Sequence, residues 1–304
     1  MQKIIVVGSS NTDLIIKMPR IPKPGETIIG GDFSMAAGGK GANQAVAAAR
    51  SGGQVTFIAR VGNDLFGEQA IKGFAADGIN VGGVIKDTNA PSGVALIFVG
   101  SDGENSIGVA SGANAKLSVE DIERTRDIIS SAGILLIQLE TPIETVKAAV
   151  QFAARGTRVI LNPAPAQPLD DEILSRVSIL TPNESEAELL TGVTIENEAG
   201  AATAATALRA RGVETVLITL GVQGVFVAGA DFCGIVPGFS VTPVDTTAAG
   251  DVFNGALAVA LAEKKPLQEA VRFANAAAAL SVTKLGAQPS APWRQEIEAF
   301  LSAR

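Results

Sequence analysis

The sequence of 304 residues contains no histidine and no tyrosine. A catalytic imidazole, a histidine-ligated zinc site and a catalytic phenol are therefore excluded. The single cysteine, Cys233, excludes an intrachain disulfide and a cysteine metal cluster, and a reducing compartment such as the cytoplasm is expected. Carboxylates, lysines, hydroxyls, amides and backbone N–H groups remain for chemistry. Phosphoryl transfer can use this set, because it depends on positioning, charge stabilisation and one weak base.

Positive charge is also scarce. Lys and Arg total 24 against 31 Asp and Glu, which gives a net charge of -7. Without a basic field, neither nucleic acid nor an anionic membrane surface is expected as a partner. No apolar run is long enough to cross a bilayer, and the short run at 4–7 predicts a strand rather than a signal peptide.

Short apolar runs alternate with alanine-rich amphipathic stretches along most of the chain. This alternation predicts an α/β fold with a mostly parallel central sheet flanked by helices on both faces. Strands are expected at 4–7, 55–61, 133–139, 158–161, 179–180 and 215–220. Helices are expected at 42–51, 65–77, 118–130, 143–155, 184–191, 198–211, 252–263, 267–282 and 293–302. No repeat or charge block interrupts the chain, so residues 1–304 are expected to form a single domain.

Two stretches break this alternation. Residues 14–18 and 26–33 read as strands without a helix between them, and residues 93–99 and 105–110 read as a hairpin. Together they predict a small β-sheet lid, formed by 12–36 and 91–111. The strand at 94–99 is apolar on both faces, so its outer face needs a cover. A homodimer that pairs two lids would supply that cover.

The segment 245–251, with the sequence DTTAAGD, precedes an apolar helical stretch. The small residues Ala248, Ala249 and Gly250 allow a ligand to approach the backbone closely, and the helix start attracts anions. Asp251 has two readings. It is either a helix cap or a proton acceptor beside a phosphoryl group, and the sequence leaves both open.

A second glycine-rich turn lies at 38–44. Its sequence, GGKGANQ, matches neither a Walker A loop nor the dinucleotide fingerprint. Gly39 allows close approach to a polar ligand, and Lys40 and Asn43 can act as donors, although the segment taken alone favours a plain turn with a solvated lysine.

Polar side chains also follow several of the predicted strands. Asn11, Asp13 and Glu140 can converge on one polyol at the carboxyl ends of the strands, or each can be a separate turn former. Asn183 and Glu186 have the spacing of a capping box, and the same helix start can also lie near nucleotide phosphates and magnesium.

Taken together, these motifs resemble the ribokinase-like (PfkB) carbohydrate kinases along essentially the whole chain. The matching segments are 8–13, 37–45, 138–141, 183–186, 245–251 followed by Asn254 and Gly255, and 284–290. The resemblance implies an ATP-dependent sugar kinase that phosphorylates D-ribose at O5. The alternative within the class is a kinase for 2-deoxyribose or another pentose or ketohexose. The alternative from a different class is a non-catalytic sugar or nucleotide sensor, which loss of Asp251 or of the anion-hole glycine would mark, and both are present.

The resemblance also implies roles for individual residues. Asp251 is expected to be the catalytic base, and the backbone of Ala248, Ala249 and Gly250 to stabilise the transferring γ-phosphoryl group. The expected sugar ligands are Asn11, Asp13, Gly39, Lys40, Asn43, Glu140 and Asp251. The expected nucleotide ligands are Asn183, Thr219, Gly221, Gly224, Gly250 and Asn275, with Mg2+ near Glu186. A monovalent cation such as K+ is expected at Asp245, Thr247, Ser281, the carbonyl of Lys284, Gly286 and Ser290.

Overall fold

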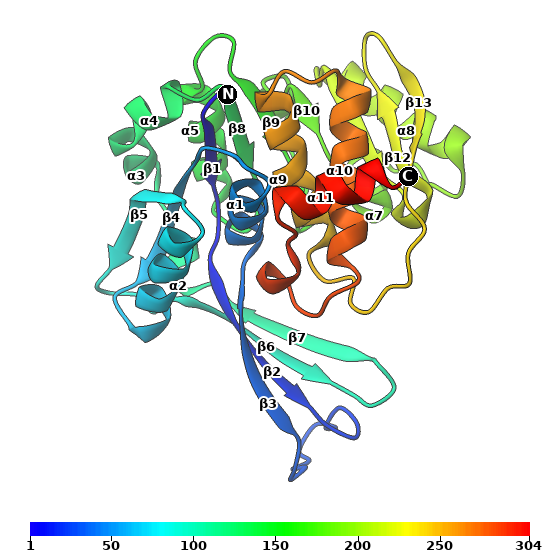
Figure 1. Cartoon of the computed structure of the whole chain (residues 1–304). Helices are drawn as coiled ribbons and strands as arrows, with labels where there is room; N and C mark the ends of the chain where they lie inside the picture. The colour runs from blue at the N-terminus through cyan, green and yellow to red at the C-terminus, as the bar shows by residue number, and fades with distance from the viewer.

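The computed structural model describes residues 1–304, and its main body is built on one nine-stranded sheet (Figure 1). The strand order is β13-β12-β11-β10-β9-β8-β1-β4-β5. Neighbours from β11 to β5 run parallel, and β12 and β13 are antiparallel additions at one edge. The strands are β1 (Ile4–Val7), β4 (Val55–Gly62), β5 (Asn80–Asp87), β8 (Ile134–Ile137), β9 (Arg158–Leu161), β10 (Ile179–Leu180), β11 (Thr215–Thr219), β12 (Gly224–Ala228) and β13 (Cys233–Pro237).

Helices cover both faces of this sheet because its strands are apolar on both sides. In β1, Ile4 and Val6 pack into one buried cluster, whereas Ile5 and Val7 pack into the other. The first cluster takes residues from α1 (Lys40–Arg50), α2 (Leu65–Ala76), α9 (Ala249–Ala262), α10 (Leu267–Ser281) and α11 (Arg294–Ser302). The second takes residues from α3 (Val119–Arg124), α4 (Arg126–Ser130), α5 (Ile143–Phe152), α6 (Asp171–Leu174), α7 (Glu184–Thr191) and α8 (Glu198–Ala210).

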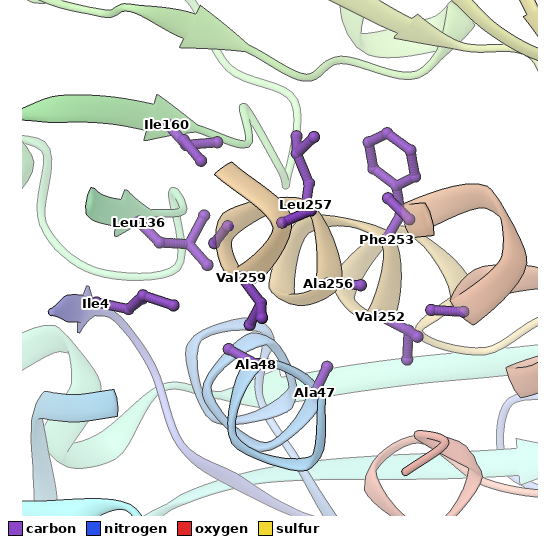
Figure 2. Packing of buried hydrophobic residues seen from close by; sticks show 14 of the residues in the cluster. Ile4, Ala47, Ala48, Leu136, Ile160, Val252, Phe253, Ala256, Leu257 and Val259 are labelled. Atoms are coloured by element: carbon purple, nitrogen blue, oxygen red, sulfur yellow. The ribbon is translucent and has the colours of Figure 1, made fainter. Parts of the chain in front are cut away.

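Helix α9 lies against both the sheet and α1 (Figure 2). Small residues bring the two helices close together: a Cβ on Gly255 would lie 2.6 Å from the carbonyl oxygen of Gln44 and 2.7 Å from the Cβ of Ala47. Val252 and Val259 point toward α1 in the same contact. This packing places the start of α9, which carries Asp251, beside the start of α1.

A separate four-stranded sheet projects from the main body (Figure 1). Its order is β3 (Asp32–Gly38), β2 (Asn11–Lys17), β6 (Gly93–Val99) and β7 (Asn105–Ala110). The central pair, β2 and β6, is parallel, and the two outer pairs are antiparallel. The register places Phe33, Met35 and Leu96 on one face, and all three are exposed.

The predicted α/β fold and second sheet are confirmed, with several corrections. The strand expected at 26–33 begins instead at Asp32, because Gly30 and Gly31 adopt φ angles of 98° and 137° that break an extended segment. The helix expected at 118–130 is two helices, since it stops at Thr125, whose hydroxyl donates back to the carbonyls of Asp121 and Ile122. Three strands, β5, β12 and β13, were not predicted. None of the helices is long and apolar enough to span a membrane.

Candidate active site

The start of α9 presents backbone hydrogen-bond donors that no group of the chain accepts. Ala248 precedes the helix with φ 60° and ψ 13°, a left-handed conformation that a residue with a Cβ adopts only at a cost. The backbone N–H groups of Gly250 and Asp251 have no acceptor within the chain, and no side chain caps the helix. They border a cavity of about 180 Å³. This helix start is therefore suited to an anion.

Asp251 is not the cap of its helix. Its side chain is 6% exposed, and its two oxygens accept hydrogen bonds from side chains of α1. Oδ2 accepts from Asn43 Nδ2 at 3.0 Å, and Oδ1 accepts from Gln44 Nε2 at 2.9 Å. Burial raises the pKa of Asp251, while Lys40 and the two amides oppose that rise. A buried carboxylate therefore lies beside the free N–H groups at the start of α9.

A pair of carboxylates, Asp13 and Glu140, lies where the small sheet joins the main body. Glu140 follows β8 and accepts from the Ser9 hydroxyl at 2.5 Å and from the backbone N–H of Lys40 at 2.9 Å. Asp13, on β2, has its pKa raised to about 6 by burial and by the charge of Glu140. Two nearby carboxylates can accept several hydroxyl protons from one polyol.

The glycine turn and Asn11 complete this recess. Gly39 has φ 88°, and a Cβ there would lie 2.7 Å from the backbone nitrogen of Asn11, so only glycine fits. Asn11 Oδ1 accepts from Asn114 Nδ2 at 2.7 Å, which leaves its own NH₂ group to donate. Asn43 Oδ1 is buried without a partner. The structure thus brings together the six predicted sugar residues of β2, the turn, α1 and the end of β8, and Asn43 links them to Asp251.

The predicted nucleotide residues other than Gly224 line two cavities that share Thr246 and Ala249. The cavity of about 180 Å³ also takes Lys40, Asn183, Glu186, Thr219, Gly250 and Asp251. The cavity of about 390 Å³ takes Gly221 and Asn275, together with the apolar side chains of Val222, Phe239, Val241, Pro243 and Val282. Sequence reasoning missed these apolar walls, which carry no motif. Gly224 lines neither cavity, because it turns the chain into β12 with φ 105°.

The capping box at the start of α7 is present. Asn183 Oδ1 accepts from the N–H of Glu186 at 2.8 Å, and Glu186 Oε2 accepts from the N–H of Asn183 at 2.9 Å. Glu186 nevertheless borders the smaller cavity, and burial raises its pKa although Lys40 lowers it. The prediction of a capping box is therefore confirmed, and the position of the motif beside the cavity is also compatible with a role near the nucleotide phosphates.

The residues predicted to hold a monovalent cation lie in two segments, the loop at 245–247 and the stretch from the end of α10 to residue 290, which Asp245 links. Its Oδ1 accepts from the N–H of Thr247 at 2.9 Å, and its Oδ2 accepts from the N–H of Gly286 at 2.8 Å. Burial alone would raise the pKa of Asp245, but these hydrogen bonds outweigh it and lower the pKa. The Lys284 ammonium pairs with Glu296 at 2.7 Å, so only its carbonyl remains available. Ser281 and Ser290 are fully buried.

The fold and the site are those of an α/β kinase acting on a small hydroxylated substrate. The model of the pfkB family carbohydrate kinases matches residues 1–294, and the chain belongs to this family. A ribokinase of Haemophilus influenzae is 49% identical over 299 residues, which are 98% of each chain. A deoxyribokinase of Salmonella typhi is 38% identical over 98% of each chain. The structure of Arabidopsis thaliana ribokinase complexed with ribose and ATP is 36% identical and superposes with a TM-score of 0.88, covering 99% of this chain and 98% of that one.

Proposed function

We propose that this protein transfers the γ-phosphoryl group of ATP to O5 of D-ribose, giving D-ribose 5-phosphate and ADP. One observation carries the proposal: a buried carboxylate, Asp251, lies directly beside two backbone N–H groups that have no acceptor. In-line phosphoryl transfer needs such a base and such an anion site side by side. The ribokinase relatives and the ribose and ATP complex of the Arabidopsis protein support these substrates.

In this mechanism the recess at the base of the small sheet holds the sugar. Asp13 and Glu140 accept hydrogen bonds from ring hydroxyls, and Asn11 donates one. The unpartnered Oδ1 of Asn43 accepts another. The O5 oxygen attacks the γ-phosphorus as Asp251 takes its proton, and the bond to the β-phosphate oxygen breaks to release ADP. The N–H groups of Gly250 and Asp251 stabilise the charge on the equatorial oxygens.

The two cavities divide the nucleotide between them. The triphosphate occupies the smaller cavity beside Lys40, Asn183 and Thr219. The purine lies in the larger one, where the apolar walls cover its faces and Asn275 and Gly221 border its edge. The Asn275 amide donates to the carbonyls of Val236 and Pro237, so only its oxygen remains to meet the base.

The donor groups fit both expected metal ions. No group of three or more acidic side chains is placed so that it could hold a metal ion, so the protein offers no carboxylate cage for a divalent ion. Mg2+ would instead be held by the phosphates and, through water, by Glu186, and it would neutralise phosphate charge. One carboxylate with neutral hydroxyl and carbonyl oxygens suits a monovalent ion, so K+ would lie among Asp245, Thr247, Ser281, Gly286 and Ser290, near the carbonyl of Lys284.

The small sheet, which includes most of residues 12–36 and 91–111, would act as a lid over the sugar. Closure of the lid excludes water, because water at the site would otherwise accept the phosphoryl group and ATP would be hydrolysed. Its exposed apolar face, with Phe33, Met35 and Leu96, supports a homodimer in which two lids cover each other. Because ATP is a cellular nucleotide, the enzyme would work in the cytoplasm.

ADP release with a panel of ribose, 2-deoxyribose, fructose, ribulose and adenosine tests the substrate. We expect the highest kcat/KM for ribose, because a site built to bond a hydroxyl discriminates strongly against its absence. A higher kcat/KM for 2-deoxyribose than for ribose would indicate a deoxyribokinase instead, an alternative that the Salmonella relative supports. Binding of sugar and ATP without any sugar-dependent ADP release would instead indicate a sensor.

A further inference from the structure

Gln44 lies on α1 directly after Asn43 and is completely buried. Its Nε2 donates two hydrogen bonds, one to Asp251 Oδ1 at 2.9 Å and one to Asn162 Oδ1 at 3.0 Å. Its Oε1 accepts from Gln138 Nε2 at 2.5 Å. Both hydrogens of the Gln44 amide are therefore used, and no part of this side chain is free to bind a ligand.

The direction of these hydrogen bonds is fixed by the backbone. Asn162 Nδ2 lies 3.0 Å from the carbonyl oxygen of Thr181, which can only accept. Asn162 must therefore point its NH₂ group at Thr181 and its oxygen at Gln44. Gln44 in turn must point its NH₂ group at Asn162 and at Asp251. The orientation of the Gln44 amide at Asp251 is thus fixed, through Asn162, by the main-chain carbonyl of Thr181.

The same hydrogen-bonded chain returns to the anion site. The Thr181 hydroxyl donates to Asn254 Oδ1 at 2.7 Å, and Asn254 Nδ2 donates to the carbonyl oxygen of Gly250 at 2.8 Å. Thr181 and Asn254 are both buried. A continuous path of buried polar groups therefore connects the carboxylate of Asp251 with the peptide group that precedes it.

We propose that Gln44 is a positioning residue for the phosphoryl transfer, which holds the Asp251 carboxylate in one orientation and keeps it an acceptor. The proposal rests on Asp251 being the base. Asp251 has only two hydrogen-bond partners, and Asn43 is also expected to meet the sugar. Gln44 is the partner that stays the same when substrate binds and leaves.

The charged groups around Asp251 do not replace this contact. No cation forms an ion pair with Asp251. Lys40 from α1 favours its ionised form at longer range, whereas Glu140 after β8 disfavours it, and Asp251 in turn raises the pKa of Glu186 of α7. Asp13 adds to the negative charge beside Glu140. A neutral amide donor directly on the carboxylate therefore sets both its orientation and the ease with which it loses its proton.

The variant Gln44→Met keeps the length of the side chain and removes both donated hydrogen bonds. We expect kcat with ribose to fall by roughly 10²-fold, the loss that a misplaced reacting group causes. The KM for ATP should change by less than about twofold. The acid limb of the kcat–pH profile should move up by about one pH unit, because a hydrogen bond to the ionised base is lost. Gln44→Glu keeps the volume, places a second carboxyl against Asp251 and should move the limb further.

Thr145→Val is the matched control. Thr145, on α5, is similarly buried and donates to the carbonyl of Leu117 at 2.5 Å, and it lines neither the sugar recess nor the two nucleotide cavities. Its loss should reduce stability and leave kcat and the pH profile unchanged. A folded Gln44→Met enzyme with kcat within threefold and an unmoved acid limb would overturn the proposal, and so would an equal kcat loss in Thr145→Val.

Gln44→Glu is judged by the same criteria where Gln44→Met does not fold. The variant Asp251→Asn separates this proposal from the function itself. Full activity in Asp251→Asn would refute Asp251 as the base and, with it, the proposed function. A nearly inactive Asp251→Asn enzyme combined with a normal Gln44→Met enzyme would remove only the role of Gln44.

Discussion

Gly250 has no structural reason to be glycine, and its replacement by alanine therefore tests the anion site. It is the second residue of α9, its φ is not positive, and an added Cβ would meet no atom within 4 Å. Gly41, at the start of α1, is different, because a Cβ there would lie 2.5 Å from the backbone nitrogen of Ser9. The empty space over Gly250 opens into the cavity of about 180 Å³.

The expected effects of Gly250→Ala on stability and on activity have opposite signs. Alanine in a helix is favoured over glycine by about 0.5–1 kcal/mol, so the variant should be as stable as the wild type or slightly more stable. The methyl group, however, would occupy the space that a phosphoryl group needs above the free N–H groups. Loss of one donor in such a site reduces kcat by about 10²- to 10³-fold.

Thermal unfolding and coupled ADP release measure the two effects on the same protein. The control is Gly73→Ala in α2, since Gly73 is exposed, helical and also has no atom within 4 Å of an added Cβ. Gly73→Ala should gain stability and keep full activity. If Gly250→Ala kept kcat within about threefold, the transferring group would not pass over Gly250 and the proposed anion site would be wrong.

Four further predictions follow from the site. Asp251→Asn should keep ATP and ribose affinity while kcat falls by about 10²- to 10⁴-fold, and a loss under about fivefold in steady-state kinetics would contradict the base. Asp13→Asn should weaken ribose binding yet stabilise the fold, because the pKa of Asp13 is raised from 3.8 to about 6 and its ionisation in the folded protein therefore costs stability as pH rises through that window. The difference in unfolding free energy between the variant and the wild type should grow from about pH 4 to 6 and then stay constant, and a pH-independent difference would contradict this prediction. Activity should be higher in K+ than in Li+ at equal ionic strength, whereas equal rates would leave Asp245 a purely structural link between two loops. Light scattering should give the mass of two chains at micromolar concentration, and Leu96→Lys should shift the mass toward one chain; a wild-type monomer would rule out pairing through the lid.

The sequence predicts the scaffold well because its signals are local. Ile4 to Val7 are apolar at every position, which is typical of a strand buried on both faces, and the structure places alternate residues in two clusters. The hairpin at 93–99 and 105–110 was predicted from its turn and is present. The strand β5 was missed since its sequence, NVGGVIKD, contains two glycines and little periodicity.

The site shows where such reasoning stops. DTTAAGD predicts a helix start with a carboxylate, yet the choice between cap and base depends on partners more than 200 positions away, Asn43 and Gln44. Likewise, nothing in the sequence around Asn162 or Thr181 relates them to Asp251. Gly224 was expected at the nucleotide; its positive φ accounts for a glycine at the turn into β12, and its contact with the nucleotide stays a prediction. Long-range hydrogen bonds of single polar residues leave no periodic pattern to read.

The way the small sheet is assembled has a consequence for how the protein folds. Its two hairpins come from separate parts of the chain, and only the parallel pairing of β2 with β6 joins them. An isolated two-stranded hairpin is marginally stable, and non-local pairing forms slowly. We therefore expect the sheet to form after β1, β4 and β5 have aligned its two halves, and its amides should exchange with solvent before those of the main sheet. The part of the molecule that is proposed to move during catalysis is thus also the part that is expected to fold last.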